Sequence, residues 1–111
     1  MKRKSDSFEY LFNYNGDHVA TFAHGQLYSL DGNNIGHYIE SINAFVDLEG
    51  FYLGEVPFLN RLLFGEYNTT VGIGYGNREA YGNIGQVRNL VNEGPIEKIE
   101  GYRDINPKLL R

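Results

Sequence analysis

Hydrophobic and polar residues alternate in short blocks along this chain, and four of the blocks can be aligned with one another. The blocks cover residues 11–20, 27–36, 45–54 and 63–72. Each one has an apolar pair, a polar turn, and then an aliphatic residue followed by Ala or Gly, apart from variations in the third and fourth. A short repeat predicts small similar units that bury their apolar faces only together.

Each block centres on two residues that are typical of a tight turn. They are Asn15-Gly16, Asp31-Gly32, Glu49-Gly50 and Tyr67-Asn68. Asn-Gly and Asp-Gly favour a two-residue type I′ turn, because both positions of that turn need a positive φ. The fourth block has Asn68 in place of Gly, and Tyr67 is a poor first turn residue, so a longer or bulged loop is an alternative there.

A two-residue turn fixes which residues face each other across each hairpin. On one side we expect the apolar pairs Phe12–Val19, Tyr28–Ile35, Val46–Leu53 and Phe64–Val71. On the other side we expect a large residue opposite Ala or Gly, in the pairs Leu11–Ala20, Leu27–Gly36, Phe45–Gly54 and Leu63–Gly72. The second set predicts a crowded place, where neighbouring backbone leaves no room for another side chain.

The repeat therefore predicts an all-β fold of four tandem β-hairpins around a pseudo-fourfold axis, small and propeller- or flower-like. One hairpin is only marginally stable, whereas four can close around a common centre and remove the exposed edges. The expected connections are Thr21–Gln26, His37–Ala44 and Glu55–Leu62, which are short enough to join neighbours. We expect a flexible N-terminus over residues 1–7 and the hairpin domain over residues 8–73.

The repeat ends at Ile73, and residues 74–111 are predicted to form an irregular, loop-rich tail that packs on the ring. Exchange of this Gly/Asn-rich segment with a partner chain is the alternative. Within it, Gln86–Glu93 is compatible with two helical turns that stop at Gly94. The range Ile96–Ile105 is compatible with one more strand.

Composition and charge exclude several classes of function. The 14 Gly and 9 Tyr favour short strands and tight turns, and the absence of Cys excludes disulfides and thiolate metal sites. A net charge of -4 argues against a nucleic-acid-binding surface. The basic cluster at residues 2–4 is followed by polar residues rather than an apolar run, so no signal peptide or membrane span is predicted. We expect a cytoplasmic protein with no nucleic-acid or membrane partner.

The four units resemble the bacterial family called 4-fold β-flower proteins. The resemblance rests on the repeat over residues 8–73, and on the segments Gly82-Asn83-Ile84-Gly85 and Gly101-Tyr102-Arg103-Asp104-Ile105. Unit four departs from the pattern, because Asn68 lacks the turn glycine and Glu66 replaces an aromatic or aliphatic residue. The resemblance implies a fold and no established activity, so it implies no catalytic residue.

The candidate metal ligands are three histidines, His18, His24 and His37. A site would require them to converge with help from Asp17 or Asp31. No short ligand spacing such as HxH, HxxxH or HExxH is present. Ordinary loop histidines are therefore favoured, and no metal is predicted.

Other candidate chemistry is also better explained by structure. The carboxylates Asp17, Asp31, Asp47 and Glu49 fall at or beside turns, where local hydrogen bonds account for them. The stretch Gly72–Gly76 lacks the spacing of a phosphate loop and is interpreted as the strand exit of unit four. Asn68-Thr69-Thr70 matches a glycosylation acceptor, but no secretory signal accompanies it. We predict no catalytic, cofactor-binding or metal-binding residue.

Five aromatic residues are more than a small ring requires. They are Tyr38, Phe51, Tyr52, Tyr75 and Tyr81. Core packing or contact between copies of the chain is favoured over ligand binding for them. The leading hypothesis is a non-enzymatic structural or protein-interaction module that self-associates. The alternative is a small-ligand module that binds a carbohydrate or peptide, and a small hydrolase that uses Asp and His from the turns is remote.

Overall fold

The computed structural model describes residues 8–87 and 91–111, and almost all of its regular structure is β-strand. The strands are β1 (Glu9–Phe12), β2 (His18–Ala23), β3 (Gln26–Tyr28), β4 (Asn34–Ile39), β5 (Ala44–Asp47), β6 (Tyr52–Phe58), β7 (Arg61–Gly65) and β8 (Tyr102–Asp104). The described helices are two short 3-10 turns, η1 (Glu40–Ile42) and η2 (Pro107–Leu110). The prediction of an all-β fold is confirmed.

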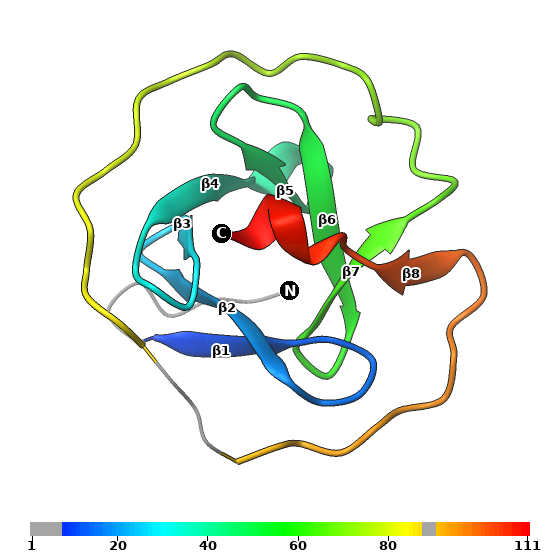
Figure 1. Cartoon of the computed structure of the whole chain (residues 1–111). Coiled ribbons are helices and arrows are strands. Elements are labelled where there is room, and N and C mark those ends of the chain that lie inside the picture. Colours follow the sequence, from blue (N-terminus) through cyan, green and yellow to red (C-terminus); the bar gives the residue numbers. More distant parts are fainter. Residues whose placement is uncertain (1–7, 88–90) are drawn as a thin grey trace.

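The strands pair in chain order and close into a barrel (Figure 1). Neighbours from β1 to β8 are antiparallel, and β1 also pairs in parallel with β7 through Phe12 and Arg61. This closure makes a barrel of seven strands, with β8 added to β7. A fourfold arrangement of hairpins is therefore not confirmed.

The first three turns differ from the two-residue type I′ prediction, which is wrong. In the first turn, the N–H of Gly16 donates to the carbonyl of Asn13 at 3.1 Å, and the N–H of Asn13 donates to the carbonyl of Asp17 at 3.0 Å. The same bonds recur in the turns at Gly32 and Gly50. These are three-residue loops in which only the glycine has a positive φ, of 85° to 91°.

The additional turn residue changes one set of cross-strand pairs and leaves the other intact. The large–small pairs Leu11–Ala20, Leu27–Gly36 and Phe45–Gly54 are confirmed. The predicted apolar pairs are wrong, because a bulge next to each turn shifts the register by one residue. The observed pairs are Phe12–His18, Tyr28–Asn34 and Val46–Tyr52.

The predicted crowding beside the small residues is also confirmed. A Cβ atom at Gly36 would overlap the carbonyl oxygen of Val46 on β5. At Gly54 a Cβ atom would lie 2.5 Å from Cδ1 of Ile105 and 2.8 Å from the carbonyl oxygen of Leu63. The neighbouring chain thus occupies the space that a side chain would need.

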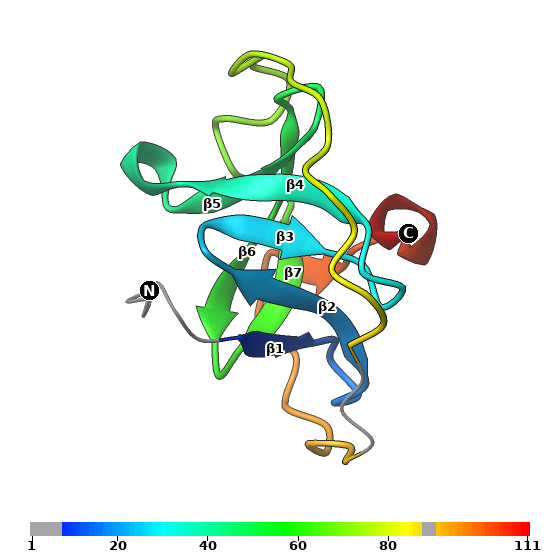
Figure 2. The same ribbon diagram turned by 90° about the vertical axis from the view of Figure 1, so that its left-hand side faces the viewer.

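The opposite end of the barrel carries tighter connections than expected. A two-residue turn at His24 and Gly25 joins β2 to β3, and another at Leu59 and Asn60 joins β6 to β7. The φ angles of these four residues are all positive, from 44° to 80°. The three segments interpreted as connections therefore consist largely of strand, and Figure 2 shows the strands running between the two ends.

The fourth predicted hairpin is wrong in its second strand. Leu63 pairs with Asp104 instead of Gly72, and Phe64 pairs with Arg103 instead of Val71. Strand β7 ends at Gly65, so residues 72–76 are not a strand exit. Strand β8 lies within the range 96–105, whose sequence is compatible with one more strand. Residues 86–93 are compatible in sequence with two helical turns. Of these, residues 88–90 lie outside the described part, and the others are not helical.

Between β7 and β8 the chain leaves the barrel and encircles it (Figure 1). We call the described parts of this segment, residues 66–87 and 91–101, the belt. It returns beside its starting point, where the N–H of Glu66 donates to the carbonyl of Gly101 at 2.8 Å. Figure 2 shows it passing over the outside of β4, β3 and β2.

The belt crosses the three glycine turns with a glycine of its own at each crossing. The facing pairs are Gly50 with Gly76, Gly32 with Gly85 and Gly16 with Gly94, and a Cβ atom on the turn glycine would overlap the belt backbone. Backbone hydrogen bonds of 2.8–3.0 Å accompany each crossing, from Tyr75 to Gly50, Ile84 to Gly32 and Glu93 to Gly16. The belt glycines are nine residues apart, so the belt has a repeat of its own.

Apolar residues fill the barrel and also lie beneath the belt. The interior cluster is formed by Leu11, Ala20, Phe22, Leu27, Ile35, Phe45, Leu53, Leu62, Ile105 and Leu110. Strand alternation turns Phe12, Tyr28, Val46 and Tyr52 outward, yet all four are buried. Ile105 and Leu110 follow the belt in the chain, so the segment after it completes the core.

Candidate functional site

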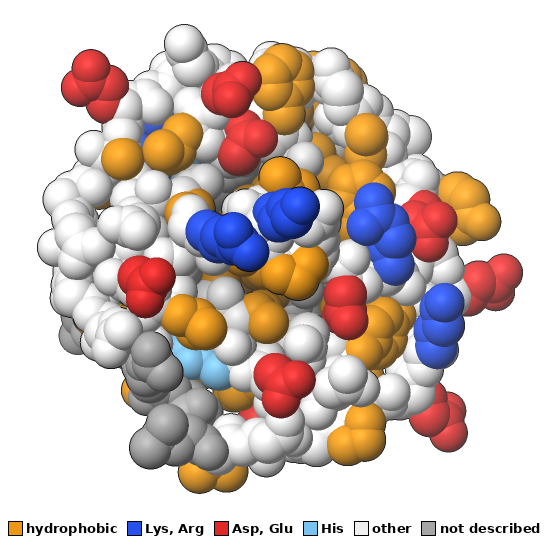
Figure 3. Space-filling view, in the orientation of Figure 1, with side chains coloured by type: hydrophobic (Ala, Val, Ile, Leu, Met, Phe, Trp, Pro, Cys, Tyr) orange, Lys and Arg blue, Asp and Glu red, His pale blue; other side chains and the backbone are white. Residues whose placement is uncertain are grey.

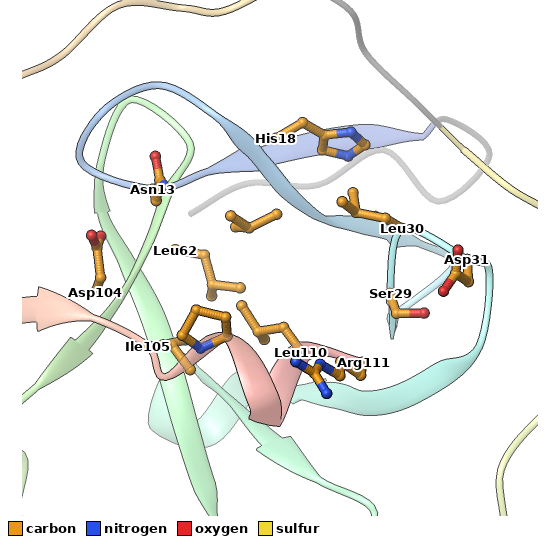
Figure 4. Close-up of a pocket in the computed structure, with 12 residues that line it drawn as sticks. Asn13, His18, Ser29, Leu30, Asp31, Leu62, Asp104, Ile105, Leu110 and Arg111 are labelled. Carbon is orange, nitrogen blue, oxygen red and sulfur yellow. The ribbon is translucent and has the colours of Figure 1, made fainter.

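A cavity of about 430 Å³ opens at the end of the barrel where η2 lies (Figure 4). Apolar side chains form its walls: Val19, Leu30, Leu62, Ile105, Pro107 and Leu110. In Figure 4 the labelled leucines and Ile105 point toward its middle. We call this space the barrel-mouth cavity.

Polar side chains surround the barrel-mouth cavity: Asn13, His18, Ser29, Asp31, Asp104 and Arg111. Asn13 and Ser29 each accept a hydrogen bond from the backbone of their own turn. Asp104 accepts one from the N–H of Tyr14 at 3.0 Å. Figure 3 shows acidic and basic side chains interspersed with hydrophobic ones over this face. The rim therefore carries acidic and basic groups, and it surrounds apolar walls.

The C-terminal segment forms one wall because its local sequence starts a short helix. The Asn106 side chain accepts a hydrogen bond from the N–H of Lys108 at 3.0 Å, and Pro107 occupies the first helical position. Ile105, just before this turn, and Leu110, its last residue, are buried in the core. Packing thus anchors η2 across the barrel mouth.

His18 borders the barrel-mouth cavity but packs mainly against aromatic rings. Its ring lies 5.0 Å from that of Tyr10 and 6.1 Å from that of Phe12, centre to centre. Its Nε2 lies 3.1 Å from Oγ1 of the buried Thr21. Burial lowers the pKa of His18, and a backbone hydrogen bond at Ala20 partly opposes this effect.

The three histidines do not converge. His18 and His24 lie at opposite ends of β2, and His37 lies within β4. Burial lowers the pKa of His37, and the positive charge of Arg78 lowers it further. In the part of the chain that the structure describes, no three His, Asp or Glu side chains are grouped to hold a metal ion.

The turn carboxylates are distributed over three separate turns. Asp17 accepts a hydrogen bond from the Asn92 amide at 2.6 Å. Asp31 lies on the cavity rim, and the side chain of Asp47 accepts two backbone bonds of 3.0 Å within its turn. Glu49 is exposed. Asp31 and His18 both border the barrel-mouth cavity, while Asp17, Asp47 and Glu49 do not line it.

The five aromatic candidates divide between core and surface. Tyr38 packs against Phe45 with ring centres 5.2 Å apart, and Tyr52 is buried. Phe51 and Tyr81 are exposed, and Tyr75 is half-buried in the belt. None of the five lines the barrel-mouth cavity.

A polar cluster around Arg78 attaches the belt to β3 and β4. Its guanidinium donates to the side chain of Gln26, to Oδ1 of Asn34 at 3.0 Å and to the carbonyl of Glu79 at 2.8 Å. The Nε of Arg78 lies 3.4 Å from Nδ1 of His37, and the guanidinium lies 4.5 Å from the centre of the Tyr81 ring. These contacts satisfy most of the donors of Arg78, which indicates a role in belt attachment.

A second polar cluster surrounds Glu55 near the start of the belt. Its carboxylate accepts hydrogen bonds from Tyr52, from the Asn68 amide at 2.7 Å and from Tyr102 at 3.0 Å. Burial, followed by the bond to Glu55, raises the pKa of both tyrosines. The amide nitrogen of Asn68, the potential glycosylation acceptor, is thus already hydrogen-bonded.

Sequence reasoning missed most of the barrel-mouth cavity, because its walls come from distant segments. Asp104, Ile105, Pro107, Leu110 and Arg111 were assigned to an irregular tail, yet they lie beside the first two glycine turns. The nine-residue spacing of the belt glycines was the one available signal that this tail is ordered along the barrel.

No protein-family model matches the chain, and no curated protein or solved structure matches it either. Among the described residues, no helix is long and apolar enough to cross a membrane.

Proposed function

We propose that the protein is a non-enzymatic binding module that holds the apolar part of a small ligand in its barrel-mouth cavity. The observation that supports this is the cavity of about 430 Å³, with apolar walls and a polar rim. Small-molecule sites typically have volumes of roughly 300–1,000 Å³ and combine apolar lining with a few polar groups. The mouths of β-barrels are a common place for such sites.

The lining favours an aliphatic group, such as an apolar peptide side chain, over a carbohydrate. Sugars generally stack on aromatic rings. No Phe, Tyr or Trp is among the described residues that line the cavity, and the one aromatic ring there, the imidazole of His18, packs against Tyr10. Leu30, Leu62 and Leu110 instead offer aliphatic surface.

A cavity-filling variant tests this proposal. We expect short apolar peptides or aliphatic amphiphiles to raise the melting temperature of the wild type, because ligands that bind the folded state stabilise it. Leu30→Trp should abolish this effect by occupying the cavity. Leu109→Trp is the matched control, because Leu109 is exposed on η2 and does not line the cavity. Equal responses from wild type and Leu30→Trp would contradict the proposal.

Self-association is the second candidate, supported by the turn between β6 and β7. Phe58 and Leu59 are 50% and 65% exposed at this turn. Leu59 also has a φ of 44°, a conformation that costs energy for a side chain of this kind. Exposed apolar patches often mark contacts between proteins.

Light scattering of the full chain tests self-association. We expect the wild type to form dimers or larger assemblies, and Leu59→Asn to shift the population toward the monomer. Asn tolerates a positive φ and removes the apolar side chain, so the turn itself should persist. A wild type that remains monomeric at high concentration would rule out this candidate.

We also propose that β7 and β8 are the fourth unit of the sequence repeat, with the belt in place of its turn. The bond between Glu66 and Gly101 at the base of the belt supports this relation to the 4-fold β-flower family. The absence of Cys is compatible with a reducing cytoplasm, where we propose that the protein acts.

A further inference from the structure

Arg61, the first residue of β7, is a buried cation with no counter-charge among the described residues. Its side chain is 3% exposed, and its Nη2 donates one hydrogen bond to the carbonyl of Gly94 in the belt. Its Nε is buried and makes no hydrogen bond. Among the described residues, no carboxylate forms an ion pair with it. A guanidinium remains charged in proteins, so its burial without a partner is unfavourable.

The partial compensation that Arg61 receives is small. Its guanidinium carbon lies 5.8 Å from the centre of the Phe12 ring, near the outer limit of a cation–π contact. Arg78, by contrast, donates to two side chains and to a carbonyl. Arg61 is therefore the buried cation that retains donor capacity.

A pocket of about 550 Å³ adjoins Arg61 on the outside of the barrel. It lies at the seam where β1 meets β7, with Phe12, Leu59 and Asn60 on the barrel side. Pro95 and Ile96 of the belt form the opposite side. We call this space the seam pocket. It shares no lining residue with the barrel-mouth cavity.

We propose that the seam pocket binds the carboxylate or phosphate group of a small molecule, with Arg61 as the anion-binding residue. A guanidinium is a planar fork of donors that matches both groups, and such charge-assisted bonds are stronger than neutral ones. The apolar side chains of Phe12, Leu59 and Ile96 suit the uncharged body of the same molecule. An oxyanion would supply the missing counter-charge.

Glu93 also lines the seam pocket, and its charge provides a separate test of anion binding there. Its N–H is held by the carbonyl of Gly16 at 3.0 Å, but its exposed side chain makes no ion pair with Arg61. A carboxylate in this position repels an incoming anion. Removal of the Glu93 charge should therefore tighten anion binding while Arg61 stays in place.

Titration of the full chain with inorganic phosphate, and separately with acetate, tests the proposal at constant ionic strength. Amide NMR shifts should saturate for at least one of the two anions, and the comparison shows which group is preferred. Arg61→Met should weaken binding about tenfold or more, because it removes the charge and keeps the apolar stem. Arg103→Met is the matched control, because Arg103 is exposed and does not line the pocket. Its guanidinium carbon lies 4.3 Å from the centre of the Phe64 ring.

Glu93→Gln provides a second measurement that leaves Arg61 and its bond to Gly94 unchanged. We expect it to tighten binding about two- to fivefold, the size of an exposed charge interaction. Absence of saturation with both anions would overturn the proposal, as would equal affinity in the wild type and Arg61→Met. An unchanged affinity in Glu93→Gln would place the anion outside the seam pocket and overturn it as well.

Discussion

At the scale of single residues, two histidines oppose protonation of the folded state. Burial lowers the pKa of His18 and of His37, and Arg78 adds a positive charge beside His37. An unfolded histidine titrates near pH 6.5, so below this pH the unfolded chain binds protons that the folded chain does not. Stability from these groups is fully present above pH 6.5 and decreases as the pH falls below it.

We therefore expect the free energy of unfolding to fall between pH 7.5 and pH 5.5. His37→Gln should reduce this slope, because Gln can still accept a hydrogen bond from Arg78 but does not titrate. His24→Asn is the control, since His24 lies at an exposed turn and Asn tolerates its φ of 51°. Urea titrations at several pH values measure the slope. A slope in His37→Gln equal to that of the wild type would contradict this account.

At the scale of elements, the glycine turns serve two purposes that can be separated. Gly32 needs its positive φ of 86° to close the loop between β3 and β4, and it also faces the backbone of Gly85 in the belt. Gly25 has a similar φ of 80° in the turn between β2 and β3, but nothing lies within 4 Å of the position of its Cβ. The two positions therefore differ in whether the belt contacts the glycine.

Alanine substitution at these two glycines measures the contribution of the belt contact. Gly25→Ala should cost about 1–2 kcal/mol from its left-handed backbone alone. Gly32→Ala should cost about 1–3 kcal/mol more, because its methyl group displaces the belt backbone. Denaturant midpoints of both variants give the difference. Equal losses would mean that the belt is not held against the turn.

The sequence allowed the all-β class and the large–small pairs of three hairpins to be predicted, for a physical reason. Close packing leaves no room for a side chain at Gly36 and Gly54, which pair with large residues. This packing therefore produces a large–small pattern that can be seen in the sequence. The belt crossings are contacts between backbone atoms, which leave only spaced glycines such as Gly76 and Gly85. The barrel-mouth cavity depends on where the belt returns the chain, so its lining could not be assigned from local pattern.

At the scale of the whole molecule, the belt packs closely against the barrel. The Cα radius of gyration is 13.0 Å, close to the value of about 13 Å for a compact chain of this length. A segment of this size would be expected to enlarge the molecule if it were an open loop. Instead, three backbone crossings and the Arg78 cluster hold it, and β8 and η2 beyond it supply Ile105 and Leu110 to the core.

This arrangement predicts that the belt can be cut without separating the molecule. A protease site inserted after Gly72 falls in an exposed stretch with no atom within 4 Å of the Cβ position. After cleavage, we expect the two pieces to elute together in size-exclusion chromatography, because the crossings and the pairing of β7 with β8 persist. The dependence of the melting temperature on protein concentration should become stronger after cleavage, since unfolding then releases two chains. Separation of the pieces in native buffer would show that the covalent connection, rather than the crossings, keeps the belt on the barrel.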